Sequence, residues 1–249
     1  MTMRRKLMAT AVFCMAMWPA GRAWGGPPFV TDDPEPVEFQ HWEVYLFSTY
    51  AHSQNFDFAT APGVEVNYGV IPEVQLHLIA PAAYAREGDG GSAKYGYGDT
   101  ELGAKYRFIK ETDTLPMVGV FPLLELPTGD ERRGLGNGRA QVFLPVWLQK
   151  SWGPWTTYGG GGFWYNHGGD RRNFWRLGWL GQRDFGEHLT LGTEIYHETP
   201  ADAGAQGHTA FNAGGFWNFD DHRHLLFSAG RDIDGPNRFS CYLGFQLTF

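Results

Sequence analysis

Two glycine-rich stretches are the first residues in this sequence that could do chemistry. Residues 134–138 read Gly-Leu-Gly-Asn-Gly, and residues 159–162 are four consecutive glycines. A phosphate-binding loop also needs a Lys-Ser or Lys-Thr pair followed by a helix, and neither stretch has that pair. We therefore interpret the first stretch as a loop. The second is part of a strand, in which glycine permits a bend or the close approach of another backbone.

Histidine and serine could support nucleophilic catalysis or metal binding. His197 and Ser228 would have to meet through strand register, and serine is scarce in the segments that would position such a pair. His222 and His224 lie in a charged stretch that is typical of a solvated turn. The sequence therefore predicts no catalytic residue, no cofactor and no metal ligand, and an enzyme is the least favoured function.

The ionisable residues instead alternate with apolar ones, as in a strand with two unlike faces. In residues 99–108 the odd positions are charged or small and most even positions are apolar, as in Glu101 beside Leu102. Residues 238–249 repeat the pattern. We find no convincing helical period after the first 23 residues.

Twelve such segments follow one another, separated by turn residues. Most are about 11 to 14 residues long, which exceeds an ordinary strand and suits a tilted strand that crosses a membrane. Short connections alternate with longer, glycine-rich and charged ones, as in outer-membrane barrels. The segments are 41–53, 59–70, 73–85, 96–109, 115–127, 139–152, 155–166, 173–185, 189–199, 207–219, 224–233 and 238–249.

The composition agrees with this arrangement. The 249 residues are 43% hydrophobic and 19% charged, and they include 34 Gly, 19 Phe, 11 Tyr and 10 Trp. Half of each strand can face lipid while the other half is polar, so the average resembles that of a soluble protein. A net charge of -7 without basic runs argues against nucleic acid as a partner.

The predicted fold is all-β, a transmembrane antiparallel β-barrel of about twelve strands and of outer-membrane type. The soluble alternative is a secreted sandwich or a lipocalin-like barrel, but twelve long strands exceed the eight of a lipocalin.

The polar face of each strand would line the lumen of such a barrel. Charges of both signs occur there, and two interpretations stay open: a polar pore that filters solutes, or a ladder of ion pairs that fills a narrow barrel. Aromatic residues such as Phe47 and Trp147 could also face inward. The predicted lumen-lining residues are Glu43, Glu65, Glu73, His77, Asp99, Glu101, Lys105, Arg107, Glu125, Arg139, Arg176, Asp184, Glu194, Glu198 and Arg238.

Residues 1–23 have the form of a cleaved signal peptide. Residues 4–6 are basic, an apolar run follows, and residues 21–23 offer a cleavage site. The run is shorter than the roughly 20 residues of a membrane anchor. Cleavage would remove four of the 20 basic residues and none of the 27 acidic ones, for a formal charge of -11. Cys241 would then be the single cysteine, without a disulfide partner in the chain.

Residues 24–40 form a proline-rich periplasmic leader ahead of the barrel, residues 41–249. Its four prolines exclude a helix. The leader is either free in the periplasm or docked, extended, at or inside the periplasmic mouth of the barrel. In the docked form its carboxylates, Asp32, Asp33, Glu35 and Glu38, could meet arginines of the lumen.

The chain ends on an aromatic residue, Phe249, after an alternating apolar strand. This ending resembles the C-terminal signal that the barrel-assembly machinery recognises, so Phe249 is the predicted assembly signal. The expected partners are this machinery, outer-membrane lipid and a small-molecule solute of unknown identity. The expected location is the outer membrane of a Gram-negative-type envelope.

Several motifs along the chain form a recognisable set. They lie at residues 27–37 (Pro-Pro-Phe-Val-Thr-Asp-Asp-Pro-Glu-Pro-Val), 41–43, 124–130 (Leu-Glu-Leu-Pro-Thr-Gly-Asp), 134–138, 144–153 and 225–231. With these motifs the sequence resembles a family of outer-membrane transporters, the "MetA-pathway of phenol degradation" proteins, over nearly the whole chain after the signal peptide. The resemblance implies a barrel and the uptake of aromatic compounds, and it brings no catalytic or ligand residues.

These observations predict an outer-membrane channel or transporter for the passive uptake of small solutes, with aromatic or hydrophobic compounds as candidates. The first alternative is a non-conducting barrel that has a structural role or binds a partner. The less favoured alternative is an outer-membrane enzyme at the loop end of the barrel.

Overall fold

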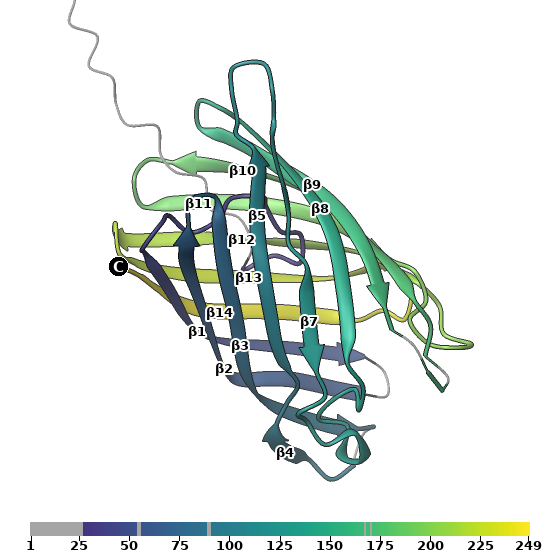
Figure 1. The fold of residues 1–249 in the computed structure, drawn as a ribbon. Coiled ribbons are helices and arrows are strands. Elements are labelled where there is room, and N and C mark those ends of the chain that lie inside the picture. The colour runs from purple at the N-terminus through teal and green to yellow at the C-terminus, as the bar shows by residue number, and fades with distance from the viewer. Residues whose placement is uncertain (1–26, 54–55, 89–90, 167, 170) are drawn as a thin grey trace, which may run out of the picture.

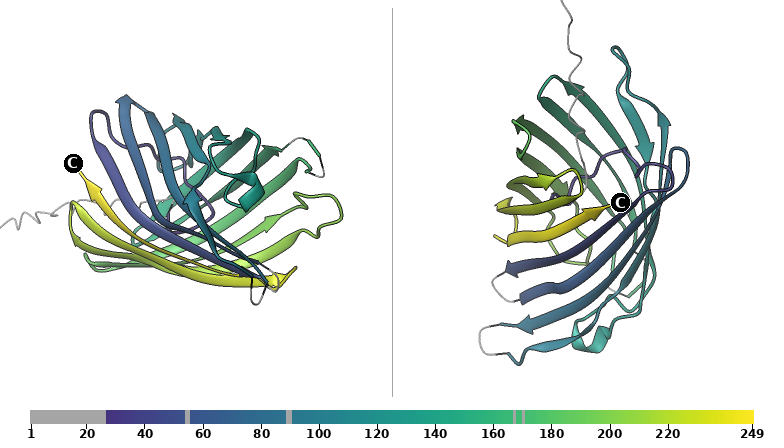
Figure 2. Two further views of the ribbon diagram at one scale, coloured as in Figure 1. Left: turned by 90° about the horizontal axis from the view of Figure 1, so that it is seen from below. Right: turned by 90° about the vertical axis from the view of Figure 1, so that its left-hand side faces the viewer.

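The strands of this chain form one antiparallel sheet that closes on itself (Figures 1 and 2). The computed structural model describes residues 27–53, 56–88, 91–166, 168–169 and 171–249. The expected signal peptide, residues 1–23, lies outside the described residues. No helix in the described part of the chain is both long and apolar enough to cross a membrane.

Fourteen strands occupy twelve positions around the described barrel, because two positions each hold two short strands. One such position holds β4 and β5, which both pair with β3, and the other holds β6 and β7, which both lie between β5 and β8. The strands are β1 (Trp42–Ser53), β2 (Phe56–Ile71), β3 (Val74–Glu87), β4 (Lys94–Tyr97), β5 (Thr100–Ile109), β6 (Met117–Val120), β7 (Leu123–Leu126), β8 (Gln141–Trp152), β9 (Trp155–Tyr165), β10 (Phe174–Phe185), β11 (Leu189–Glu198), β12 (His208–Asp220), β13 (Arg223–Asp234) and β14 (Phe239–Thr248).

The predicted twelve-stranded barrel is confirmed, and each predicted segment corresponds to one position in it. The structure differs from the prediction at two positions, where the predicted strand is split into two short strands. Residues 96–109 break at Gly98 and Asp99, and residues 115–127 break at Phe121 and Pro122. Proline has no backbone N–H to donate to a strand ladder, which explains the second break.

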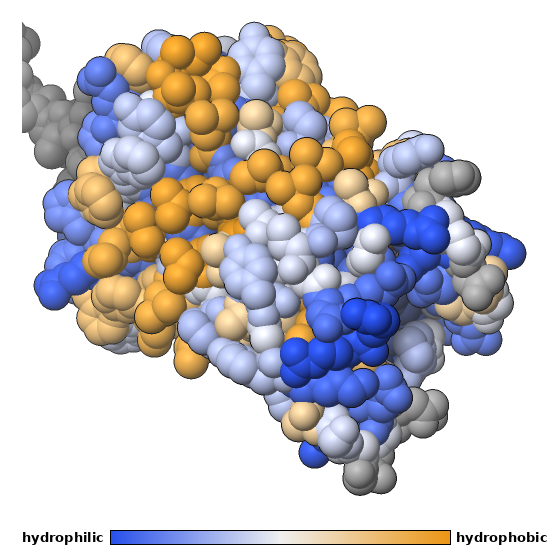
Figure 3. All heavy atoms as spheres, turned by 60° about the horizontal axis from the view of Figure 1, so that its bottom comes forward, coloured by the Kyte–Doolittle hydropathy of each residue, from blue (hydrophilic) through white to orange (hydrophobic). Residues whose placement is uncertain are grey.

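The outward side chains of the strands are apolar and exposed. Leu46, Leu144 and Leu243 are each 57–58% exposed, although leucine normally lies in a core. Hydrophobic side chains gather over the strands in Figure 3, and hydrophilic ones gather beyond the strand ends. Closure through the β1–β14 pair completes the hydrogen-bonded ring, which hydrocarbon requires because it cannot satisfy a free strand edge.

Large aromatic residues mark both ends of the strands. At the end with the short turns, Trp152 and Trp155 are more than half exposed, and at the end with the long loops Tyr165 and Trp175 are about half exposed. Two such rings are typical of the membrane interfaces of an outer-membrane barrel.

The connections differ in length at the two ends. A two-residue turn joins β8 to β9, and Gly153 adopts the positive φ of 55° that this turn needs. At the other end, the loop between β7 and β8 contains a single 3₁₀ turn, η1 (Glu131–Arg133), capped by Asp130. Leu135 of this loop is buried, so the loop folds into the barrel mouth instead of standing free in solvent.

The last residue pairs with the first strand. Trp42 and Phe249 exchange two backbone hydrogen bonds of 2.7 and 3.0 Å, and the side chain of Phe249 is 62% exposed. The terminal aromatic is therefore accessible on the finished barrel, and its role in assembly stays a prediction.

Candidate functional site

Residues 27–37, called the plug segment below, lie inside the barrel, whereas residues 38–41 are exposed. The segment runs through the space that the strands enclose, nearer the short-turn end (purple in Figures 1 and 2). Thr31 and Asp33 are only 1% exposed, and Pro34 is fully buried. Of the two positions that the sequence left open for the proline-rich leader, the contacts correspond to the docked one.

Backbone groups of the plug segment are bound by side chains of the barrel wall. The carboxylate of Glu194 on β11 accepts hydrogen bonds from the N–H groups of Val30 at 2.9 Å and Thr31 at 2.8 Å. Across the lumen, Gln75 on β3 accepts a bond of 2.9 Å from the Val37 N–H. These bonds satisfy polar backbone that has no strand partner, as burial requires.

The acidic side chains of the plug segment meet basic residues of β5. The Lys105 ammonium lies 3.0 Å from Asp32 Oδ1 and 3.6 Å from Asp33 Oδ1, and Arg107 lies 3.6 Å from Glu35 Oε1. The sequence suggested arginine partners for these acids, but a lysine holds two of them. Burial raises the pKa of Asp33 to about 7, although the nearby Lys105 pulls it the other way.

One aromatic side chain anchors the N-terminal part of the plug segment. Phe29 packs in a cluster with inward side chains of five strands, which are Tyr45, Phe47, Tyr158, Leu180, Phe216 and Leu226. Two glycines leave room beside this part of the plug. A Cβ at Gly178 would collide with the Thr31 hydroxyl and lie 3.2 Å from Thr31 Cβ, and one at Gly192 would lie 3.3 Å from the Phe29 ring.

Polar side chains on β2, β3 and β5 form a connected chain beside the plug. His77 Nδ1 lies 2.7 Å from Asn67 Oδ1, and His77 Nε2 lies 3.0 Å from Glu101 Oε1. Asn67 donates a bond of 2.8 Å to Glu65. Glu43 on β1 accepts a bond of 2.8 Å from the Tyr45 hydroxyl. These buried groups satisfy one another, which is the arrangement that a low-dielectric interior requires.

The wall formed by β8 to β14 carries a second cluster, toward the long loops. Arg176 lies 2.6 Å from Glu198, and its guanidinium is about 5.5 Å from the ring centres of Phe143 and Trp164. Arg238 donates to the Tyr196 hydroxyl at 3.3 Å. The arginines of this wall are thus held by carboxylates, a hydroxyl and aromatic faces.

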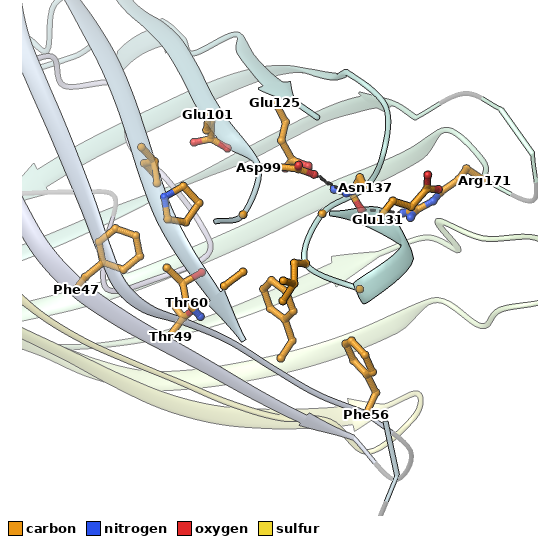
Figure 4. A pocket seen from close by; sticks show the side chains of 18 residues that line it. Phe47, Thr49, Phe56, Thr60, Asp99, Glu101, Glu125, Glu131, Asn137 and Arg171 are labelled. Atoms are coloured by element: carbon orange, nitrogen blue, oxygen red, sulfur yellow. Dashed lines mark hydrogen bonds between the residues drawn. The ribbon is translucent and has the colours of Figure 1, made fainter. Parts of the chain in front are cut away.

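The half of the lumen nearer the long loops is called the outer half below, and the half nearer the short turns is called the inner half. The outer half contains a cavity of about 600 Å³, called the outer cavity below. Phe47 and Phe56 lie on one side of it, and the carboxyl groups of Asp99, Glu101 and Glu125 lie on the other (Figure 4). A volume of this size is typical of small-molecule pockets. The outer cavity is therefore large enough to hold a small molecule.

The predicted lumen residues fall into groups. Most lie inside the barrel, but Arg139 is exposed in the loop before β8 because that strand begins only at Gln141. Five of the others are buried around the plug: Glu43, Glu65, His77, Lys105 and Glu194. Three line the outer cavity, Asp99, Glu101 and Glu125, and two are paired near the short turns, Glu73 and Arg107. The last four belong to the wall formed by β8 to β14: Arg176, Glu198 and Arg238 lie toward the long loops, and Asp184 accepts a hydrogen bond from Thr190.

The residues considered for catalysis or metal binding make other contacts. Ser228 is buried and donates to the Pro28 carbonyl at 2.5 Å, whereas His197 bonds to Thr209 at 2.9 Å on the face shared with the exposed Ile195. His222 Nδ1 lies 2.9 Å from the Thr248 carbonyl. Within the described residues, no three side chains of His, Cys, Asp or Glu are grouped so that they could hold a metal ion.

Sequence reasoning missed three kinds of residue. Gly178 and Gly192 looked like ordinary strand glycines; the plug explains the missing side chain at Gly178, whereas a Cβ at Gly192 would meet Gln182 of the wall as well as Phe29. Leu135 belongs to a stretch that was interpreted as an outer loop, yet it lines the outer cavity. Arg171 also lines it and donates to Asn137 at 2.9 Å. For these residues the sequence offered one signal, which was the hydrophobic Leu135 within an otherwise glycine-rich loop.

Comparison with solved structures finds outer-membrane barrels. The COG4313 outer membrane channel from Pseudomonas putida F1 matches with a TM-score of 0.67 at 17% identity, over 87% of this chain and 98% of that one. The NanC porin matches with a TM-score of 0.57 at 9% identity, over 82% and 98%. The KdgM porin in complex with disordered oligogalacturonate matches with a TM-score of 0.55 at 9% identity, over 82% and 99%. At these identities the likeness shows a shared fold.

Comparison by sequence gives a family. No curated protein matches the chain closely enough to count as a relative. The family described as "Putative MetA-pathway of phenol degradation" matches residues 45–249, which is nearly the whole barrel. The resemblance noted in the motifs is thereby confirmed, and the chain belongs to this family of outer-membrane β-barrel proteins.

Proposed function

We propose that this protein is a passive outer-membrane channel that opens when the plug segment leaves the inner half of the lumen. The observation that carries the proposal is the way the plug is held. Among the described residues, five strands (β3, β5, β8, β11 and β13) make hydrogen bonds or ion pairs with it, and most of these bonds run through carboxylates, an ammonium and backbone N–H groups. Polar contacts of this kind can be exchanged for water, unlike the contacts of a fully apolar core.

The solutes that fit best are small and partly apolar. Phe47, Phe58 and Ile79 line the outer cavity, so an aromatic or aliphatic group can be buried there. The family description refers to phenol degradation, which supports aromatic compounds as candidate solutes. Passive transport without catalysis agrees with the positions of Ser228 and His197, because they lie on opposite faces of the barrel wall and cannot act together on a substrate.

Planar-bilayer recording of the refolded protein tests the proposal. Deleting residues 27–38 removes the plug and leaves Gln40 and His41, which hydrogen-bond to Gly69 at the rim. We expect long-lived open currents from the deletion variant and mostly closed records with brief openings from the full-length chain. Heat-modifiable migration in gel electrophoresis confirms that each barrel is folded.

A non-conducting structural barrel is the alternative, and the same recording separates the two. If the folded deletion variant stays closed at all voltages, the channel proposal is wrong and the barrel has a structural or partner-binding role. A conducting deletion variant removes that alternative.

We further propose that Phe249 takes part in assembly of the barrel in the outer membrane. Its exposed ring lies beside the seam where β14 meets β1, so assembly factors could reach it before and after closure. Deletion of Phe249 should slow the appearance of folded protein in pulse-chase experiments. Normal folding rates and normal outer-membrane levels after the deletion would argue against this role.

A further inference from the structure

The outer cavity has two unlike walls. The side formed by β1, β2 and β3 is apolar, with Phe47, Phe58 and Ile79 facing the cavity. The opposite side carries Asp99 and Glu125, and Figure 4 shows their carboxyl groups next to each other. A ligand that fills the cavity therefore meets apolar surface at one end and carboxylates at the other.

Most carboxyl groups of the outer cavity have no ion-pair partner among the described residues, although Glu101 lies 3.0 Å from His77. The carboxyl groups that line the cavity are those of Asp99, Glu101, Glu125 and Glu131, against one guanidinium, Arg171. Among the described residues, Asp99, Glu125 and Glu131 form no ion pair with lysine or arginine. Arg171 lies 3.8 Å from Asp202 and donates to the Asn137 side chain.

The plug region shows the contrast. There Lys105 lies within 4 Å of both Asp32 and Asp33, and on the outer wall Arg176 is paired with Glu198 at 2.6 Å. Lys105 and Arg176 thus neutralise acids around the plug and at the long-loop end, whereas Asp99, Glu125 and Glu131 of the cavity have no lysine or arginine partner among the described residues. Uncompensated negative charge around a recessed cavity raises the local concentration of cations.

We propose that the outer cavity binds an organic cation whose ammonium group is joined to an aromatic or short aliphatic body. The ammonium lies against the carboxylates, where its N–H groups donate charge-assisted hydrogen bonds. The body packs against the phenylalanines of the opposite wall. This inference refines the proposed channel, and it rests on that proposal for the route by which the cation enters.

A bare metal ion fits this cavity poorly. Both oxygens of Asp99 already accept backbone N–H bonds, from Gly129 at 2.8 Å and Asn137 at 2.5 Å. Glu125 accepts a bond from the Asn137 side chain, and Glu101 faces His77. An ammonium needs only one remaining lone pair from each of several carboxylates, whereas a divalent cation needs several oxygens at fixed short distances.

Isothermal titration of the full-length barrel in detergent tests the inference with three probes of matched size. These are benzylammonium, benzyl alcohol and phenylacetate, each corrected for partition into protein-free micelles. We expect benzylammonium to bind about tenfold more tightly than benzyl alcohol because of its charge-assisted bonds, and phenylacetate to bind least. Equal binding of benzylammonium and benzyl alcohol, or tighter binding of phenylacetate, would overturn the inference.

Variants locate the bound probe. Glu125→Gln combined with Glu131→Gln keeps both side-chain shapes and an acceptor for Asn137, and it should weaken benzylammonium about tenfold while leaving benzyl alcohol unchanged. Glu187→Gln, in an exposed short turn, is the matched control and should change neither. Unchanged benzylammonium binding in the folded double variant would place the probe outside this cavity. Binding at equilibrium does not require conduction. A barrel that binds benzylammonium but never conducts would therefore contradict the channel proposal and leave the cation-binding inference intact.

Discussion

The two halves of the lumen treat acidic side chains in opposite ways. In the inner half, Asp32 and Asp33 lie against Lys105, and Glu194 binds the backbone of the plug segment. In the outer half, Asp99 and Glu125 line a cavity without a basic partner in the described structure. Both halves are built from the same alternating strands, so the difference arises from which side chains face inward and from the plug.

This difference indicates what each half can do. Charges that are paired with groups of the same chain hold a closed arrangement together, because losing one partner leaves the other buried and unsatisfied. Charges without partners are available to a solute that brings its own. In the channel that we propose, the inner half is therefore the part that must change for conduction, and the outer half is the part that can select.

A side chain added beneath the plug should have the largest effect. Gly178→Val places new atoms against Thr31, where even a Cβ has no room. Gly181→Val is the matched control on the same strand, because nothing lies within 4 Å of a Cβ there. We expect the first variant to be open in nearly all bilayer records and the second to behave like the unchanged barrel. Closed records from a folded Gly178→Val barrel would contradict the role of the plug.

Removing the buried ammonium should have the next largest effect. Lys105→Met leaves Asp32 and Asp33 without their counter-charge, which in a buried site costs about 3–5 kcal/mol. The ratio of open to closed time should therefore rise by roughly two to four orders of magnitude, since each 1.4 kcal/mol is about a factor of ten. Lys94→Met removes a partly exposed partner of Glu87 and should leave the ratio unchanged. Equal gating in both variants would argue that the plug is held by its apolar contacts alone.

The raised pKa of Asp33 predicts a dependence on pH. The docked carboxyl, with a pKa of about 7 against an ordinary value of 3.8, holds its proton at pH values where the undocked one has lost it. Docking is therefore favoured at low pH and loses stability as the pH rises from about 4 to about 7. The charged groups that act on Asp33 include Lys105, Asp32 and Glu35, and Glu43 on β1 also lies close enough to interact with it.

Bilayer recording between pH 5.5 and 8 measures this effect. The open fraction should rise by about tenfold over that range, since one unit of linked titration is worth about 1.4 kcal/mol. Asp33→Asn should remove most of the change. A profile that is identical in the Asp33→Asn barrel would assign the dependence to other groups.

Neutralising the outer half should give the smallest effect. In a barrel without residues 27–38, Glu125→Gln with Glu131→Gln should lower the cation-to-anion permeability ratio about threefold at about 0.1 M salt, with little change at 1 M, because salt screens exposed charges. The open fraction should not change. Altered gating in this double variant would contradict the separation of the two halves.

The barrel was predictable from the sequence, because alternation, strand length and loop asymmetry are local patterns. A proline such as Pro122 favours a break in a strand, but the register in which the two resulting short strands pair with their neighbours could not be predicted from the sequence. The polarity of Lys105 and Glu194 predicted that they face inward. Their partners in the plug were not predictable, since Glu194 and Thr31 are more than 160 residues apart and the shear of a barrel cannot be read from one strand.

The contents of the lumen needed the structure for a second reason. A proline-rich segment has the same sequence whether it is free or docked, and only the space left by Gly178 and the carboxylate of Glu194 distinguish the two. The outer cavity depended on a loop. Leu135 of this loop lines the cavity, and the position of a long loop is not fixed by alternation.

A reversible lock on the plug tests the central claim most directly. Thr31→Cys with Gly178→Cys, in a Cys241→Ser background, places two thiols whose Cβ atoms would lie close to the 3.2 Å separation seen here, near the range of a disulfide. We predict closed bilayer records from the oxidised barrel and recurrent openings of the same molecules after reductant is added. Steady conduction through the oxidised, fully cross-linked barrel would contradict the claim that the plug segment closes this channel.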